Sequence, residues 1–529
     1  MTRLLINNIK IALDDDEKNA LTRAKQILIK QKIDTRDFEF SVYKKSIDAR
    51  NKNSIFFVYT VLATSPSNVV VALNDNIRAL KDVEIDFERG VDALCGVPVV
   101  VGMGPAGMFC ALFLAENGYR PIIIDRGDSV EDRVKAIEKF FETGILDTES
   151  NVQFGAGGAG TFSDGKLTTR INDSMCNYVL ERFVEFGAPS EILTKSKPHI
   201  GTDILTKVVQ NILVKIEELG GQVIYRCRMD DINFASSDGI EVITTKGAFK
   251  TNALVLALGH SARDTYRMLL SHNLVIEPKS YSVGVRVEHL QKDIDVALYG
   301  KYAGHPKLGV GEYNLSDTNG RGVYTFCMCP GGEVVAATSM EQGVCVNGMS
   351  KFARDGVNAN CAVNVSVDKS DYGNNAYKAI EFQENLERRA YLAAGGNYFA
   401  PIQLMGDFLE DKVEHMPSRI LPTYAGGKRT TVTNLGDVLP CFVTQRLKEG
   451  FCSFDRKING FAVADAVLTG IETRTSAPIR IMRNEKMCAI SQPFIYPCGE
   501  GAGYAGGIMS SAVDGLKVAT EIIKKYKPL

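Results

Sequence analysis

The chain has 529 residues, of which 45% are hydrophobic and 23% are charged, as is ordinary for a globular protein. Its 61 Lys and Arg residues nearly balance its 63 Asp and Glu residues, so charge gives no case for nucleic acid or an acidic membrane as the main partner. No apolar run reaches the roughly 18 residues of a membrane span, and the apolar N-terminus is too short for a signal peptide. At about 100–200 residues per domain, this length predicts about three domains. The twelve cysteines are scattered, apart from Cys327 and Cys329, so we expect a cytoplasmic protein with reduced thiols.

Residues 1–92 are predicted to form a separate small α+β domain. Residues 3–13, "RLLINNIKIAL", have strand character, and 16–32 carry apolar residues at helical spacing, with acid at the start and lysine at the end. Two further β-rich stretches, 38–50 and 54–64, are expected to pair with the first strand. Because no catalytic motif occurs here, we interpret this region as a docking or lid domain.

The stretch 98–127, "PVVVGMGPAGMFCALFLAENGYRPIIIDRG", predicts a buried strand, a glycine-rich turn, a helix and a second strand. Gly102 permits the tight turn, Gly104 lets the backbone approach a pyrophosphate, and Gly107 lets the helix pack against the strand. The helix N-terminus offers free N–H groups to phosphates, and an acid at the end of the second strand can accept hydrogen bonds from a ribose. The order of these elements predicts a dinucleotide site made by Gly102, Gly104, Pro105, Ala106, Gly107, Asp125 and Arg126.

Two distant segments favour FAD over NAD. In 251–262, an apolar strand ends in Ala257-Leu258-Gly259, which resembles the second fingerprint of FAD-binding folds, although Leu258 stands where that fingerprint usually has Thr. Residues 496–519 resemble the closing fingerprint of flavoproteins related to glutathione reductase and p-hydroxybenzoate hydroxylase. Residues from about 270 to 490 contain no second strand–GxGxxG–helix unit, which argues against a disulfide reductase with two nucleotides.

The closing fingerprint implies specific contacts to the flavin. Glu500 takes the place of an acid, commonly Asp, that binds the ribityl chain. The helix that follows would point its positive end at the pyrimidine edge of the flavin, which becomes anionic on reduction. The residues assigned to FAD from these two segments are Gly259, Gly499, Glu500, Gly506, Gly507 and Ile508.

Four strings together resemble one family of proteins. They are "NVQFGAGGAGTFSDGKL" (151–167), "YTFCMCPGGEVVAATSMEQGVCVNGMS" (324–350), "GIETRTSAPIRI" (470–481) and "GEGAGYAGGIMSSAVDGLKVA" (499–519). They are similar to the bacterial uncharacterised FAD-dependent dehydrogenases, which also carry a small N-terminal domain. The resemblance covers nearly the whole chain and implies a flavoprotein oxidoreductase, but it supplies no substrate. One departure is Ala156, where we would expect an acid.

The glycine-rich loop 155–166 is expected to reach the flavin. Gly157 and Gly158 would let the backbone approach the cofactor, and Thr161 and Ser163 could donate hydrogen bonds to it. Lys166 is either close to flavin N5 or a solvated loop lysine.

Four residues are candidates for substrate chemistry. Cys327 and Cys329 could relay electrons as a dithiol, whereas buried free cysteines are usually inert and the following Pro-Gly-Gly turn could instead bring backbone to the flavin. Arg474 and Arg480 could bind an anionic substrate through their planar guanidinium groups, or form salt bridges.

No catalytic residue is assigned. Arg286 and Glu288 share one face of a strand and could simply pair, and His289 is a weaker candidate for a proton donor. The remaining Cys and His residues lack ligand spacing, so we predict no metal site. Hydride transfer to a flavin mainly requires placement of the donor carbon, so the sequence need not show a base.

We therefore predict an α/β fold with three parts. These are the N-terminal α+β domain (1–92), a Rossmann-type FAD-binding domain in two pieces (96–269 and 491–529), and an inserted mixed α+β substrate or cap domain (270–490). The predicted function is hydride transfer between an unidentified small molecule and bound FAD, with NAD(P)H as a transient reductant in a close variant. The alternative is a flavin-bound interaction or RNA-modification component that docks through residues 1–92. The oligomeric state is left open.

Overall fold

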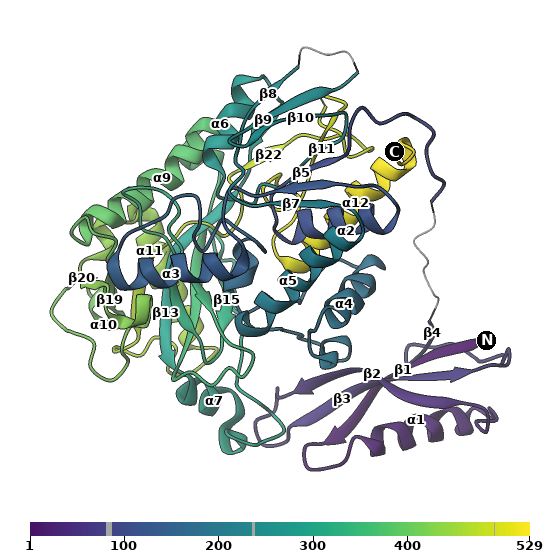
Figure 1. The fold of residues 1–529 in the computed structure, drawn as a ribbon. Coiled ribbons are helices and arrows are strands. Elements are labelled where there is room, and N and C mark those ends of the chain that lie inside the picture. The colour runs from purple at the N-terminus through teal and green to yellow at the C-terminus, as the bar shows by residue number, and fades with distance from the viewer. Residues whose placement is uncertain (81–86, 235–237, 491) are drawn as a thin grey trace.

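The computed structural model describes residues 1–80, 87–234, 238–490 and 492–529, so the predicted domain boundary at residue 491 lies outside the described residues. Figure 1 shows a small N-terminal sheet beneath two larger bodies of structure. One of these is built on a parallel sheet made from both the middle and the C-terminal end of the chain. The other is built on a larger mixed sheet.

The N-terminal domain is a four-stranded antiparallel sheet with one helix. Its elements are β1 (Thr2–Ala12), α1 (Lys18–Lys30), β2 (Glu39–Asp48), β3 (Phe56–Ser65) and β4 (Ile77–Ala79), and the strand order is β2-β3-β1-β4. Alternate residues of β3 are buried, and α1 covers that face with Ala20, Ala24 and Leu28. β3 pairs with β1 as expected, but β2 pairs with β3 and not with β1. The reason is that strands joined by a short hairpin pair with each other.

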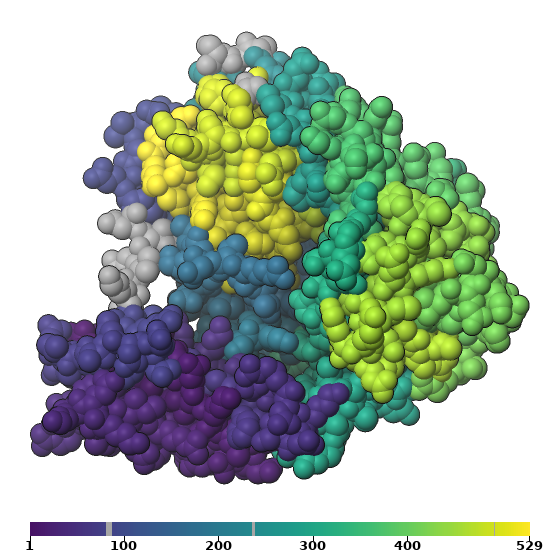
Figure 2. Space-filling model, turned by 180° about the vertical axis from the view of Figure 1, so that it is seen from behind, coloured from purple at the N-terminus to yellow at the C-terminus, as the bar shows by residue number. Residues whose placement is uncertain are grey.

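Backbone pairing and apolar packing both hold the N-terminal domain against the rest of the chain. Lys45 of β2 forms a parallel bridge with Lys195, so the edge of this sheet continues into the neighbouring domain. Tyr299 and Leu308 belong to the same apolar core as β1 and β3. In the space-filling view of Figure 2, the purple N-terminal domain accordingly lies beneath the other two domains.

The nucleotide-type domain contains a five-stranded parallel sheet in the order β23-β11-β5-β6-β7. Each neighbouring pair is parallel, and the apolar strands are covered on both faces. Helices α2 and α12 pack closely against each other and are almost entirely buried. The elements are β5 (Val99–Val101), α2 (Pro105–Glu116), β6 (Ile122–Ile124), α3 (Val130–Thr143), α4 (Met175–Glu185), α5 (Thr202–Glu218), β7 (Gln222–Ile224), β11 (Leu254–Leu256), α6 (Arg263–Ser271), β23 (Ile495–Pro497) and α12 (Ile508–Lys525).

A separate three-stranded antiparallel sheet, in the order β10-β9-β8, precedes β11. Its strands are β8 (Met229–Asn233), β9 (Ile240–Thr244) and β10 (Gly247–Thr251). This is the β-meander expected from the sequence. The stretch 222–234, however, divides into β7 of the parallel sheet and β8 of the meander. The α/β fold class with a Rossmann-type domain is thus confirmed.

The remaining domain has a seven-stranded sheet in the order β14-β15-β18-β13-β21-β19-β20. Its central strand, β13, is buried at all ten positions, because neighbours lie on both edges and side chains cover both faces. A short pairing of β12 (Ile276–Pro278) with β22 (Ile479–Ile481) joins the two larger domains. The other elements are β13 (Tyr281–Leu290), α7 (Gln291–Tyr299), β14 (Ser316–Asp317), β15 (Val323–Cys329), β16 (Glu333–Ala336), β17 (Val346–Met349), β18 (Asn358–Val367), α8 (Lys369–Tyr372), α9 (Ala376–Ala393), β19 (Ala400–Leu404), α10 (Met405–Leu409), β20 (Thr430–Val432), α11 (Cys441–Asp455) and β21 (Val467–Glu472).

Candidate dinucleotide site

The first glycine-rich turn is closed so tightly that side chains are excluded. Gly102 has φ +106°, and a Cβ there would lie 2.2 Å from the Ala257 carbonyl oxygen. A Cβ on Gly107 would lie 1.9 Å from the Gly102 carbonyl oxygen. Helix α2 begins at Pro105, whose missing N–H costs nothing at the first helical position. The turn therefore presents backbone alone at the start of a buried helix.

The second glycine-rich loop lies directly against the first. A Cβ on Gly158 would lie 2.9 Å from Cα of Gly104, and the Gly157 N–H donates to the Met103 carbonyl at 2.8 Å. Two backbone segments more than fifty residues apart thus meet without side chains between them. This arrangement is what the close approach of a pyrophosphate to backbone requires.

Asp125 joins these loops. Its carboxylate accepts hydrogen bonds from the N–H groups of Met103 (2.8 Å), Gly127 (2.9 Å) and Gly155 (2.9 Å). The neighbouring Arg126 pairs with Glu149 and Asp264 and lies over the Phe154 ring, with 4.5 Å from its guanidinium carbon to the ring centroid. Asp125 and Arg126 therefore lie beside the first glycine-rich turn, as predicted. Both side chains already have protein partners.

A residue that sequence reasoning missed shapes the second loop from within. Arg133 on α3 is fully buried and donates hydrogen bonds to the carbonyls of Asn151 (2.8 Å), Val152 (2.9 Å) and Ala156 (2.7 Å). Burial lowers the pKa of Arg133 to about 9, and the charge of Asp125 opposes this shift. The local sequence does not predict that Arg133 binds this loop, because the carbonyls it contacts are about twenty residues further along the chain.

The polar side chains of the second loop are turned inward. Thr161 contacts the Ala156 carbonyl at 3.5 Å, and Ser163 donates to the Gly160 carbonyl at 2.6 Å. Lys166 pairs with Asp164 at 2.5 Å and lies 3.9 Å from Glu312. The loop's hydroxyls and its lysine thus already have protein partners, and contacts from them to a flavin stay predictions.

The C-terminal segment completes the convergence. A Cβ on Gly499 would lie 2.6 Å from Cβ of Ala106, and one on Gly501 would lie 2.4 Å from the Gly259 carbonyl oxygen. The Tyr266 hydroxyl contacts the carbonyls of both Gly259 (2.7 Å) and Gly501 (3.0 Å). On α12, Asp514 accepts from the Gly499 N–H at 2.7 Å and pairs with Arg483. The three predicted fingerprints therefore meet at one end of the parallel sheet.

Open space faces several of the predicted glycines. A Cβ built on Gly259, Gly506 or Gly507 would meet no atom within 4 Å. Gly507 is the N-cap of α12, with Ile508 the first helical residue, so the helix N-terminus faces this space. We call the space lined by these two sets of glycines the cradle; Gly102, Gly107 and Gly158 contact protein closely, and Gly259, Gly506 and Gly507 face open space. Because its lining is mainly backbone, the cradle fits a dinucleotide.

Glu500 is the one carboxylate predicted to touch the flavin. It is half-buried, and no described residue donates a hydrogen bond to its side chain. Desolvation raises the pKa of Glu500 to about 7, against the opposing charge of Lys279. The side chain can therefore hold a proton close to neutral pH and donate a hydrogen bond to a ligand.

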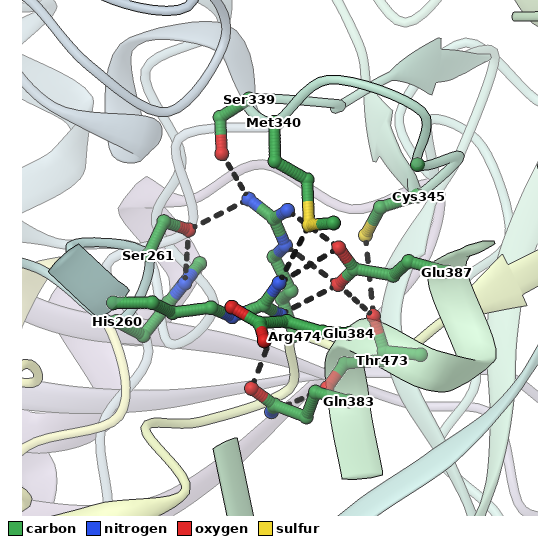
Figure 3. A network of polar contacts seen from close by, with 12 residues as sticks. His260, Ser261, Ser339, Met340, Cys345, Gln383, Glu384, Glu387, Thr473 and Arg474 are labelled. Carbon is green, nitrogen blue, oxygen red and sulfur yellow. Dashed lines mark hydrogen bonds and ion pairs between the residues drawn. The ribbon is translucent and has the colours of Figure 1, made fainter. Parts of the chain in front are cut away.

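The two candidate substrate arginines lie in different surroundings. Arg474 is buried in the network of Figure 3, where Glu387 accepts from it at 2.9 and 2.7 Å and Ser261 and Ser339 also contact it. Arg480 on β22 is exposed, contacts the Gly503 carbonyl at 3.2 Å and lies over Tyr504, with no carboxylate partner among the described residues. Only Arg480 is placed beside the 499–504 segment with its charge unpaired.

The remaining candidates each have protein partners of their own. Arg286 pairs with Glu472 at 2.7 Å, not with Glu288, whose carboxylate is held by Asn358 and Thr423. His289 is buried, its Nε2 is 2.7 Å from the Phe461 carbonyl, and burial lowers its pKa. Within the described ranges, no group of three or more His, Cys, Asp or Glu residues could hold a metal ion.

Comparison with known proteins adds two family matches and one relative. A family described as "FAD-dependent protein, C-terminal domain-like" matches residues 280–475, and a domain of unknown function, DUF8436, matches residues 1–64. An uncharacterised protein of Clostridium beijerinckii is 46% identical over 530 residues, which is 98% of each chain. The first match coincides with the domain built on the seven-stranded sheet.

Solved structures overlap with this chain only loosely. Glycine oxidase from Geobacillus kaustophilus is 13% identical, with a TM-score of 0.34 over 81% of this chain and 95% of its own. L-proline dehydrogenase from P. horikoshii is 15% identical, with a TM-score of 0.33 over 81% and 93%. At such scores the shared shape assigns no activity. In addition, none of the helices in the described ranges has the length and hydropathy that a bilayer crossing requires.

Proposed function

This chain belongs to the same family as the uncharacterised Clostridium beijerinckii protein, and we propose that it is an FAD-dependent protein that transfers a hydride between a small molecule and bound FAD. The observation that supports this most directly is the convergence of four glycine-rich segments that are remote from one another in the sequence. Gly104 meets Gly158, and Gly501 meets Gly259, at one end of a parallel sheet. A simple NAD-binding domain needs only the first of these segments.

The residues that would hold FAD follow from this arrangement. The turn Gly102–Gly107 and the start of α2 offer N–H groups to the pyrophosphate, and Gly157 and Gly158 leave room for it. Glu500 would contact the ribityl chain, and the N-terminus of α12 at Gly507 would favour negative charge on the flavin. When bound, FAD supplies a two-electron acceptor.

The substrate side is proposed to lie near Glu500. Lys279 directly follows β12, Arg480 lies on its partner strand β22, and the charge of Lys279 acts on the Glu500 carboxyl. A carboxyl that can be protonated near neutral pH, beside two cations, suits a substrate that carries an acidic group and exchanges a proton. Use of NAD(P)H as a transient reductant is a variant of the same proposal.

The alternative of an interaction or RNA-modification component stays a prediction, as does a cytoplasmic location. Two observations separate the alternatives. An oxidoreductase should lose its visible flavin absorption when the right reductant is added anaerobically, whereas a component that only carries flavin should keep it. A protein that is folded, colourless and unable to take up added FAD would refute the proposal.

A further inference from the structure

Cys327 and Cys329 lie at an irregular point of the large sheet. The pairing of β15 with β18 shifts register between Phe326 and Cys329, and Cys327 has φ +43°. Such left-handed backbone is uncommon for a residue with a side chain, and a bulge re-aims the side chains it carries. The two sulfur atoms are 3.9 Å apart.

This pair is distinct from the other cysteines. All twelve cysteines of the chain are described and free, and this is the one pair among them whose sulfurs lie within hydrogen-bonding distance. Cys327 is half-buried and Cys329 is buried. Cys441 and Cys452 are exposed but stand alone, and most of the others are buried single thiols.

The surroundings divide the pair into a nucleophile and a resolving thiol. A hydrogen bond from Cys329 lowers the pKa of Cys327, and the charges of Arg286 and Lys166 act in the same direction, against burial and Asp164. The same hydrogen bond and burial raise the pKa of Cys329. Arg286 is anchored here, because Nη1 donates to the Cys327 carbonyl at 3.1 Å and lies 3.9 Å from Cys329 Sγ.

We propose that Cys327 and Cys329 form a thiol–disulfide exchange site that reacts with a low-molecular-weight disulfide. The half-buried position of Cys327 favours a small reactant over a second protein surface. The activity goes beyond the proposed flavin chemistry and does not depend on it.

The reaction has two steps. The Cys327 thiolate attacks one sulfur of the small disulfide, forming a mixed disulfide and releasing one thiolate. Cys329 then loses its proton and attacks the Cys327 sulfur, which closes the intramolecular disulfide and releases the second thiolate. In total the protein dithiol loses two electrons and two protons, and the small disulfide gains both and becomes two thiols. Closure requires the sulfurs to approach from 3.9 Å to about 2.0 Å.

The test uses the purified full-length protein, reduced, desalted without oxygen and incubated with oxidised glutathione as the probe. We expect the wild type to lose two free thiols, with a link between Cys327 and Cys329 in its peptide map that dithiothreitol reverses. Cys329→Ser should trap glutathione on Cys327, and Cys327→Ser should do neither. Cys441→Ser is the matched control and should behave as the wild type.

Two results would overturn the proposal. One is a wild type that keeps both thiols while the exposed Cys441 or Cys452 takes up glutathione. The other is stable glutathione on Cys327 of the wild type without closure. Because the wild type decides both, a variant that fails to fold does not obscure the result. Flavin content is recorded in parallel, so that failure of FAD binding and failure of thiol exchange are read separately.

Discussion

Glu387 and Arg474 form a two-point ion pair in which the carboxylate is wholly buried. Nε and Nη2 of Arg474 lie 2.9 and 2.7 Å from the Glu387 oxygens, and Arg263 donates to the same carboxylate at 2.9 and 2.7 Å. Glu387 is on α9, Arg263 begins α6 of the nucleotide-type domain, and Arg474 follows β21. One carboxylate therefore ties α6, which follows the second fingerprint, to the inserted domain. Figure 3 shows its pairing with Arg474.

We expect Glu387→Gln to lower the free energy of unfolding by about 3 kcal/mol or more, because two arginines would keep their charge without a buried partner. The matched control is Glu384→Gln, which removes a partly exposed pair with Arg267 on the same helix and should cost at most about 1 kcal/mol. Urea denaturation of the three proteins measures the difference. Equal losses for both variants would contradict this account.

The Glu387 carboxylate should also affect how the free energy of unfolding falls at acidic pH. Burial opposes its ionisation, but Arg263 and Arg474 outweigh burial and hold the pKa of Glu387 far below the ordinary range. Its contribution is therefore complete above the unfolded-state pKa of about 4.3 and is lost as pH falls toward the folded-state pKa. Unfolding free energies measured from about pH 6 downward should fall less steeply in Glu387→Gln than in the wild type. Parallel curves would show that another group controls the acid limb.

Comparing Gly158→Ala with Gly320→Ala should distinguish the effect of the loop contact on FAD binding from the effect of backbone strain on stability. Gly158 has φ +62° and would place a Cβ 2.9 Å from Gly104, whereas Gly320 has φ +73° and would meet nothing within 4 Å. Both Ala variants should lose about 1–2 kcal/mol of stability from left-handed backbone. Only Gly158→Ala should also lose FAD affinity, by at least about tenfold, because the gap between the two loops is altered. Retention of FAD during gel filtration measures this, and equal retention by both variants would mean that the loop contact does not serve FAD.

Local pattern predicted the parts of this fold that depend on local rules. The stretch from Val99 to Asp125 has apolar strands, glycines at fixed spacing and a proline at the helix start, and each of these has a direct physical consequence. The split of 222–234 into two sheets was not predictable in this way. Its residues alternate as any strand does, and the partner strands that divide it lie elsewhere in the chain.

The ion pairs of the buried charged residues could not be predicted from the sequence either. Arg286 and Glu288 are two residues apart on one face of β13. Arg286 nevertheless pairs with Glu472, which lies nearly two hundred positions later on the neighbouring strand β21. Arg133 and Glu387 also find their partners only through the tertiary fold. A buried charge needs an opposite group within the same desolvated site, and which group lies there depends on the tertiary fold.

Glu500 should produce a stability slope of the opposite sign from Glu387. Desolvation raises its pKa to about 7, so the folded state binds more protons than the unfolded state between about pH 4 and pH 7. Stability of the cofactor-free protein should fall by up to about 3 kcal/mol as pH rises through this window. Glu500→Gln should remove that loss. Glu485→Gln, which removes an exposed carboxylate shortly before this segment, should keep it. An unchanged slope in Glu500→Gln would refute the raised pKa.

Arg480 and Arg474 offer the sharpest contrast between a binding and a structural role. Arg474→Met should lose about 3 kcal/mol or more of stability, because it leaves Glu387 short of a partner, whereas Arg480→Met should change stability by at most about 0.5 kcal/mol. If Arg480 binds an anion, inorganic sulfate at constant ionic strength should raise the Tm of the wild type more than that of Arg480→Met. General exclusion of sulfate from the surface acts on both proteins equally, so the difference isolates the site. Equal shifts would remove Arg480 as an anion ligand and leave the substrate side without a specific cation beyond Lys279.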